Sequence, residues 1–100
     1  MRVLVVARPQ FPVPPDELPG VVEGATQWYE RHKGKLEQFG LFPGGGGFGV
    51  VDVPDGETLN QMLLEMPFAA FSQHDILPFV PGETGLSQMK EALAARAASV

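Results

Sequence analysis

The sequence predicts an α+β fold in which strands and helices follow the order β-α-β-β-α-β, with one further helix at the C-terminus. β-branched or apolar runs that stop at a proline indicate strands, and segments in which apolar residues recur at three and four indicate helices. The 10 prolines and 12 glycines fall mostly between these segments and mark their ends. The chain of 100 residues has the length of one domain, so we expect residues 1–100 to form a single domain with residues 81–100 as a C-terminal helical arm. This arm would lie over a neighbouring subunit or, as the alternative, over its own chain.

The first part of the chain predicts a strand and a long helix. Residues 2–8 are rich in β-branched side chains and stop before a proline, which favours a buried strand. Four prolines in residues 9–15 predict an extended loop. Acidic residues 16–17 suit the positive end of a helix dipole. Apolar residues spaced by three and four across residues 18–39 predict a helix of about six turns, and Gly40 is expected to cap its C-terminal end.

A hairpin is predicted after this helix. Residues 41–42 are expected to form a short second strand, followed by a flexible turn at residues 43–47, which read PGGGG. A third strand at residues 48–53 then ends at a proline.

The last third of the chain predicts helix, strand and helix. Asp55 is the expected N-cap of a helix that ends at Pro67. Residues 71–80 form the predicted fourth strand, in which Pro78 indicates an edge position or a bulge. The C-terminal helix has one apolar face, formed by Leu86, Met89, Leu93 and Ala97.

This order of elements is that of the ferredoxin-like split βαβ fold. The two crossover helices would cover one face of the sheet and leave the other face bare. The first strand is apolar on both sides, because Val3, Val5 and Ala7 alternate with Leu4 and Val6. A bare apolar sheet face requires a partner. We therefore expect two copies to pair sheet against sheet, in a homodimer or a larger homo-oligomer.

Composition and charge exclude several classes of partner and site. The net charge of −5 argues against nucleic acid, which a basic surface would bind. No apolar run approaches the roughly 20 residues that span a membrane, and residues 2–8 are too short for a signal peptide, so we expect a cytoplasmic protein. The absence of cysteine excludes a disulfide, a thiolate nucleophile and a cysteine zinc site. Two histidines with a distant acid are too few to predict a metal site.

Three segments resemble the muconolactone isomerase family: VVDVP at residues 50–54, MPFAAF at residues 66–71 and ILPF at residues 76–79. The resemblance implies a ferredoxin-like fold assembled as a dimeric α+β barrel. It also implies an enzyme without a cofactor that shifts a double bond in an unsaturated lactone by proton transfer. Before the third strand the family carries larger and polar side chains, whereas this chain has PGGGG at residues 43–47. We interpret that difference as room for a larger substrate.

Three residues are the candidates for catalysis. His32 follows Tyr29 by three positions and Trp28 by four, in step with the apolar stripe, so it is expected to face inward and act as a general base. The alternative is a histidine satisfied within the core. The Tyr29 hydroxyl or His74 would stabilise an oxyanion; for Tyr29, the alternative is core packing. His74 and Asp75 are neighbours on a strand and point to opposite faces, so they cannot pair directly.

Four residues are the candidates for substrate binding. Trp28 would stack on a flat ligand, with core packing as the alternative. Arg8 would bind an acidic group through two hydrogen bonds, with a plain surface position as the alternative. The aromatic residues Phe48 and Phe71 complete the set.

The sequence leaves three functions open. The first is a cofactor-free, isomerase-like enzyme that moves a proton on a small unsaturated lactone or a related cyclic carbonyl compound. The second is a non-catalytic module for ligand binding or assembly, because few ionisable groups fall on inward faces. The third is a cofactor-free monooxygenase of the same fold, whose aromatic substrate Trp28 and Phe48 would stack against.

Overall fold

A computed structural model describes residues 1–98 of the chain. It contains four strands, three α-helices and a short 3₁₀ helix, η1, among these residues. Their bounds are β1 Arg2–Pro9, α1 Leu18–His32, β2 Leu36–Leu41, β3 Gly47–Asp52, α2 Gly56–Leu64, η1 Pro67–Phe71, β4 Ser72–Phe79 and α3 Gly82–Ala98. All neighbouring strands run antiparallel, in the order β2-β3-β1-β4. The predicted ferredoxin-like α+β fold with a C-terminal helix is therefore confirmed.

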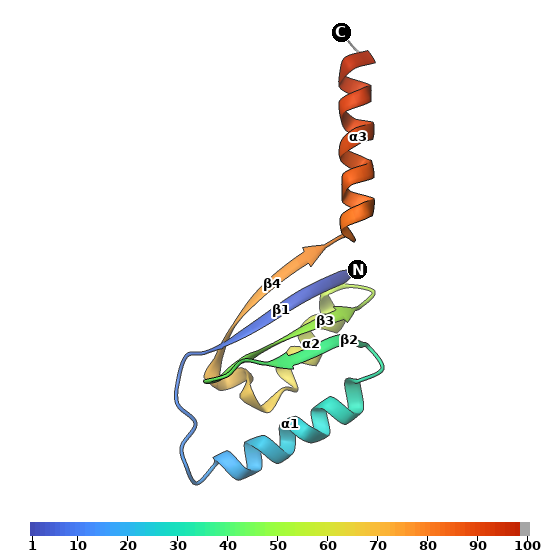
Figure 1. The fold of residues 1–100 in the computed structure, drawn as a ribbon. Coiled ribbons are helices and arrows are strands. Elements are labelled where there is room, and N and C mark those ends of the chain that lie inside the picture. Colours follow the sequence, from blue (N-terminus) through green and yellow to red (C-terminus); the bar gives the residue numbers. More distant parts are fainter. Residues whose placement is uncertain (99–100) are drawn as a thin grey trace.

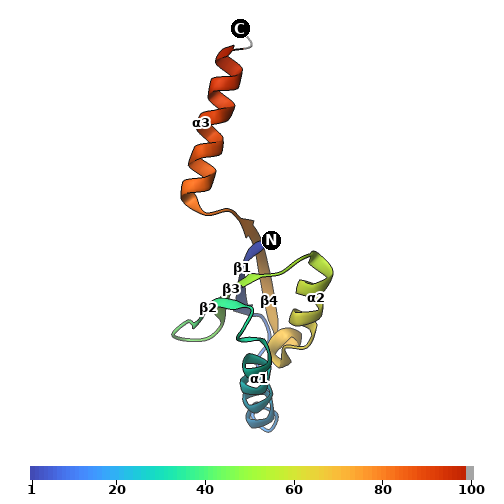
Figure 2. The ribbon, with the colours of Figure 1, turned by 90° about the vertical axis from the view of Figure 1, so that its right-hand side faces the viewer.

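The core lies between the sheet and the helices on one of its faces. Val3 and Val5 of β1 project to this face, as does Val51 of β3, which pairs with Val3. Trp28 of α1 packs on the same cluster, together with Val53, Leu59 and Met62. Figure 2 shows α2 and η1 on one side of the strands.

The opposite face of the sheet is open. Its central residues are Leu4 and Val6 of β1, which pair with Leu77 and Asp75 of β4. Leu77 is 53% exposed and Phe79 on the same face is 39% exposed. Helix α3 leaves the end of β4 and projects away from the sheet (Figure 1), which gives the chain extents of 66 × 24 × 22 Å. The helices therefore leave this sheet face uncovered.

The predicted helix over residues 18–39 is wrong beyond His32. Helix α1 ends there, and residues 36–41 form β2 instead of the short strand predicted at residues 41–42. A register shift between Leu36 and Gln38 puts Leu36 and Phe39 on the same face of β2. Because a bulge adds one residue to the strand, a spacing of three imitates the helical period. Gly40 is likewise no helix cap, since it lies in β2 opposite Phe48.

Local signals in the second half are confirmed. The Asp55 carboxylate accepts a hydrogen bond of 2.8 Å from the Thr58 N–H at the start of α2. The hydrogen bonds from Thr58 lower the pKa of Asp55, because they stabilise the charged form. Pro67 follows the end of α2 and opens η1, and Pro78 lies in the edge strand β4. The turn between β2 and β3 contains Gly44, Gly45 and Gly46, all at positive φ.

Candidate functional site

His32 and Glu65 join the ends of α1 and α2. His32 is the last residue of α1 and Glu65 directly follows α2. The His32 Nε2 atom lies 3.0 Å from Oε2 of Glu65, and the His32 side chain is only 14% exposed. The His32 ring is also centred 5.2 Å from the Trp28 ring. The imidazole is therefore held between an aromatic ring and a carboxylate.

The Glu65 carboxylate sets the tautomer of this histidine. Its Oε1 atom accepts a hydrogen bond of 3.1 Å from the Gln61 side chain. The hydrogen bonds from Gln61 and then His32 lower the pKa of Glu65, so the carboxylate is ionised at neutral pH. An ionised carboxylate only accepts hydrogen bonds. The Nε2 atom of His32 therefore carries a hydrogen, which leaves Nδ1 as the basic nitrogen of the neutral ring.

The pair borders an open depression of about 450 Å³ between the end of α1 and α2. Residues of both charge signs and two uncharged polar side chains surround it. The lining residues are His32, Lys35, Glu57, Thr58, Gln61, Met62 and Glu65. This arrangement places a base, an ammonium group and hydroxyl and amide groups around one small volume, which suits a small polar molecule.

Trp28 and Tyr29 precede His32 by four and three positions in α1, but they do not line this depression. Trp28 is 5% exposed, and its indole N–H donates a hydrogen bond of 2.8 Å to the Met62 carbonyl oxygen. The Tyr29 ring packs 5.2 Å from the Phe39 ring of β2. Both side chains therefore take part in packing between α1 and the rest of the fold.

His74 lies toward the other end of the sheet. In the register of β1 and β4 it is opposite Ala7, near the end of β1. Lys35 shares the depression with His32. Its backbone carbonyl accepts a hydrogen bond from the Asp52 N–H, and Asp52 pairs with Arg2 at the start of β1. The two histidines therefore do not share the depression that His32 lines.

The substrate-binding candidates Arg8 and Phe48 occupy the open face of the sheet. The Arg8 side chain pairs with Asp75 at 3.0 Å, and the Phe48 ring stacks on Phe42 at 5.9 Å. Phe71 is half-buried at the end of η1, and its carbonyl accepts hydrogen bonds from the N–H groups of residues 10 and 11. The sheet thus separates Arg8 and Phe48 from the histidines. The assigned catalytic and binding roles stay predictions.

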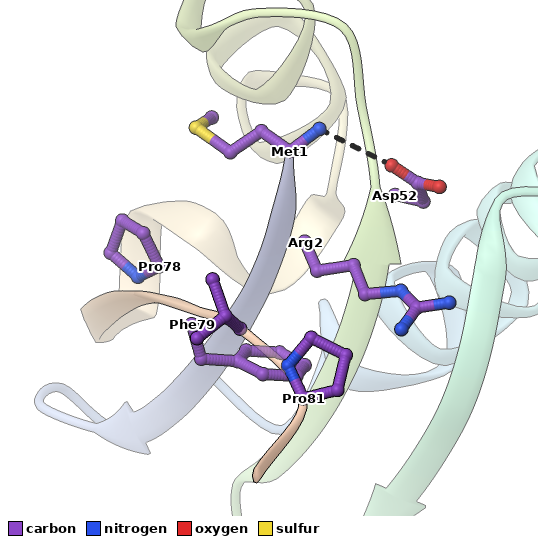
Figure 3. Close-up of a pocket in the computed structure, with 7 residues that line it drawn as sticks. Met1, Arg2, Asp52, Pro78, Phe79 and Pro81 are labelled. Carbon is purple, nitrogen blue, oxygen red and sulfur yellow. Dashed lines mark hydrogen bonds and ion pairs between the residues drawn. The ribbon is translucent and has the colours of Figure 1, made fainter. Parts of the chain in front are cut away.

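A second depression lies at the base of α3. It has a volume of about 770 Å³ and is lined by Met1, Arg2, Asp52, Pro78, Phe79, Val80 and Pro81 (Figure 3). The N-terminal ammonium group pairs with Asp52 at 3.3 Å on its rim. The glycine-rich turn at residues 44–47 lines neither depression. In the described residues, no three histidine or acidic side chains are grouped to hold a metal ion.

The sequence interpretation missed the residues that surround His32. Glu65 and Lys35 are unremarkable charged residues at the ends of helices, and the sequence gives no sign that they meet. One local signal was present: Gln61 and Glu65 are spaced by four, which puts them on one helix face. That spacing predicts the contact between Gln61 and Glu65, but it does not point to His32.

Among residues 1–98, no helix is both long and apolar enough to cross a membrane. No protein-family model matches the chain, and no curated protein matches it either.

Solved structures with the same fold exist. A 5-chloro-2-hydroxyhydroquinone dehydrochlorinase from Burkholderia phenoliruptrix AC1100, in complex with 2,5-dihydroxybenzoquinone, is similar with a TM-score of 0.64. The sequences are 16% identical, and the match covers 84% of this chain and 98% of that one. A muconolactone isomerase is similar with a TM-score of 0.68 and 20% identity, over 82% of this chain and 93% of that one. The chain therefore shares the fold of muconolactone isomerase, which confirms the predicted resemblance at the level of the fold.

Proposed function

We propose that this protein is a cofactor-free enzyme that moves a proton on a small unsaturated lactone or a related cyclic carbonyl compound. The contact of 3.0 Å between His32 and Glu65 on the rim of the depression carries the proposal. Histidine is the side chain best suited to exchange a proton near neutral pH. A carboxylate that fixes one ring nitrogen orients the other toward its task, as in known acid-base pairs. The shared fold with the dehydrochlorinase, which holds a flat quinone, supports a flat cyclic ligand.

The reaction needs one base and one group that stabilises negative charge. His32 Nδ1 would take the proton from the carbon next to the carbonyl, and the electrons of that C–H bond would form an enolate. The same nitrogen would return the proton to the far carbon of the unsaturated system, so the double bond moves and no atom is lost. Lys35 lines the depression and would stabilise the enolate oxygen. Tyr29 and His74, predicted for that task, do not line it.

The test is isomerisation of α-angelica lactone, a β,γ-unsaturated lactone, to its conjugated isomer, followed by ultraviolet absorbance. We expect catalysis by the wild type and a loss of about 10²-fold or more for His32→Gln. Glu65→Gln should also slow the reaction, because an amide does not impose the tautomer that leaves Nδ1 basic. Glu30→Gln is the matched control, since Glu30 pairs with Lys33 at 2.7 Å on the exposed side of α1.

Two results would count against this mechanism. One is a wild-type rate equal to that of buffer with this lactone and with ring-substituted relatives. The other is a His32→Gln variant as active as the Glu30→Gln control. Deuterium incorporation next to the carbonyl, followed by NMR in D₂O, reports the first proton transfer even where the double bond does not move.

A non-catalytic ligand-binding module is the second candidate. The openness of the depression beside His32 and its charged rim favour it, because enzymes that transfer protons usually exclude water from the site. A binding module would take up the lactone without turnover, and His32→Gln would keep most of the affinity. Calorimetric titration of the lactone into the wild type and into the His32→Gln variant separates the two functions.

We further propose that the open face of the sheet is covered by a second copy of the chain. Leu4, Val6, Leu77 and Phe79 lie on this face. An apolar sheet face is rarely left in water. Two copies related by a two-fold axis would bury the same patch on each. Leu77→Glu should then lower the mass of the protein measured by light scattering, and an unchanged mass would contradict the pairing.

A further inference from the structure

Helix α3 presents an apolar stripe to solvent. Leu86, Met89 and Leu93 are 60%, 62% and 63% exposed, and their spacing puts them on one side of the helix. None of the residues described in α3 is buried, and the helix points away from the rest of the fold in both views (Figures 1 and 2). Most of the stability of a protein helix comes from packing of its apolar face against other elements. The stability of α3 therefore calls for a contact outside its own chain.

The exposed area of the chain shows how much surface remains to be covered. The accessible surface is 7060 Å². A compact protein of 10.8 kDa exposes about 5,500 Å², so the surplus is about 1,500 Å² per chain. Each partner contributes roughly 800 Å² to an interface of standard size. The surplus is therefore enough for two interfaces, one of which is the pairing that we propose for the open sheet face.

We propose that α3 is a second self-association surface, which pairs antiparallel with α3 of another copy. The two-residue link between β4 and α3 places the sheet at one end of α3. In a parallel pair, the like ends of the two helix dipoles would lie side by side, which is unfavourable. In an antiparallel pair, the sheets lie at opposite ends, and the two helix dipoles oppose each other favourably.

Charge and shape define one register for the antiparallel pair. When Leu86 faces the partner's Met89, the reciprocal contact forms by symmetry. In the same register Glu83, at the flank of the stripe, lies beside the partner's Lys90, so that two ion pairs border the apolar contact. Leu93 then lies beside the partner's Gly82, where the absence of a side chain allows close approach.

The depression at the base of α3 receives the end of the partner helix in this register. The helices overlap over residues 82–93, so the alanine-rich last turn extends past the link of the other copy. That link borders the depression shown in Figure 3, and its Val80 is 53% exposed. Small side chains can enter such a depression without displacing its walls. The partner's α3 therefore completes this site, which a single chain leaves open.

Cross-linking tests the proposal, because the chain has no cysteine of its own. Gly82→Cys and Leu93→Cys are made in separate full-length chains. A Cβ at Gly82 meets no atom within 4 Å, so the first substitution fits the fold. After mixing and mild oxidation, we expect a disulfide-linked dimer that contains one chain of each kind, and no dimer from either variant alone. A dimer of Leu93→Cys alone would show parallel pairing, and no product from the mixture would show that the helices do not pair; either result overturns the proposal.

Mass measurement gives an independent readout. The variant Leu86→Glu with Leu93→Glu places two charges on the stripe, and we expect it to have half the mass of the wild type by light scattering. The control, Gln88→Glu with Ala95→Glu, has the same spacing and the same added charge on the far side of α3 and should keep the wild-type mass. Equal masses for the two variants overturn the proposal. Lactone turnover is measured in a separate assay. The masses therefore report on the pairing of α3 even if the protein does not catalyse the proposed reaction.

Discussion

Replacement of Trp28 by phenylalanine tests whether this residue serves packing, as its position in the structure indicates. The indole N–H is the donor to the Met62 carbonyl, in the last turn of α2, where carbonyl groups lack helical partners. Loss of that donor in a buried site costs about 1–3 kcal/mol. The smaller ring leaves a cavity of roughly 40 Å³, which adds about 1 kcal/mol. We therefore expect the free energy of unfolding to fall by about 2–4 kcal/mol, or roughly 30- to 1,000-fold in the folded-to-unfolded ratio.

The assay is urea unfolding followed by far-ultraviolet circular dichroism. Tryptophan fluorescence is unsuitable because Trp28 is the only tryptophan in the chain. Protein concentration is held fixed, since an oligomer is stabilised by mass action. Tyr29→Phe is the control: it keeps the ring that contacts Phe39 and should change the free energy by less than about 1 kcal/mol. An unfolding midpoint for Trp28→Phe equal to that of the wild type would refute the reasoning.

Two further predictions concern local structure. Asp55→Ala should lower stability at neutral pH by removing the cap of α2. The pKa of Asp55 is lowered in the folded state, so its contribution to stability is complete above the unfolded-state pKa near 4 and is lost as the pH falls through the folded-state pKa. The urea midpoints of the wild type and the variant should therefore converge in acid. A difference between the midpoints that stays constant with pH would contradict this. Gly40→Ala should destabilise by about 1–3 kcal/mol in a thermal melt, because the new Cβ would overlap the Phe48 ring. Gly20→Ala, where a Cβ meets open space in α1, is its control and should be neutral or stabilising.

The sequence was sufficient for the features that depend on neighbours along the chain. The β-branched residues in residues 2–8, followed by a proline, predicted β1, and the spacing of apolar residues after Asp55 predicted α2. Asp55 itself was recognised as an N-cap because the bond it makes spans only three residues. The prolines and glycines that break periodicity marked the turns for the same reason: their effect on φ is a property of the residue.

Where one pattern suits two structures, the sequence was not sufficient. Leu36 and Phe39 continue the helical stripe of α1, and only pairing with β3 shows that a bulged strand accommodates the same spacing. The inward direction of His32 followed from its place in the stripe. Its contact with Glu65, 33 residues away, did not, because a side-chain contact between two helices depends on how they pack against the sheet.

The sequence by itself determined the order of strands and helices and the N-cap of α2, since these follow from the backbone geometry of adjacent residues. Tertiary structure alone decided that the sheet separates Arg8 and Phe48 from the histidines, that Trp28 bonds to α2 and that α3 projects from the fold. The physical reason is that each of these depends on the register of strands and the direction of a two-residue link, and small changes in either move side chains to another face or another end of the molecule.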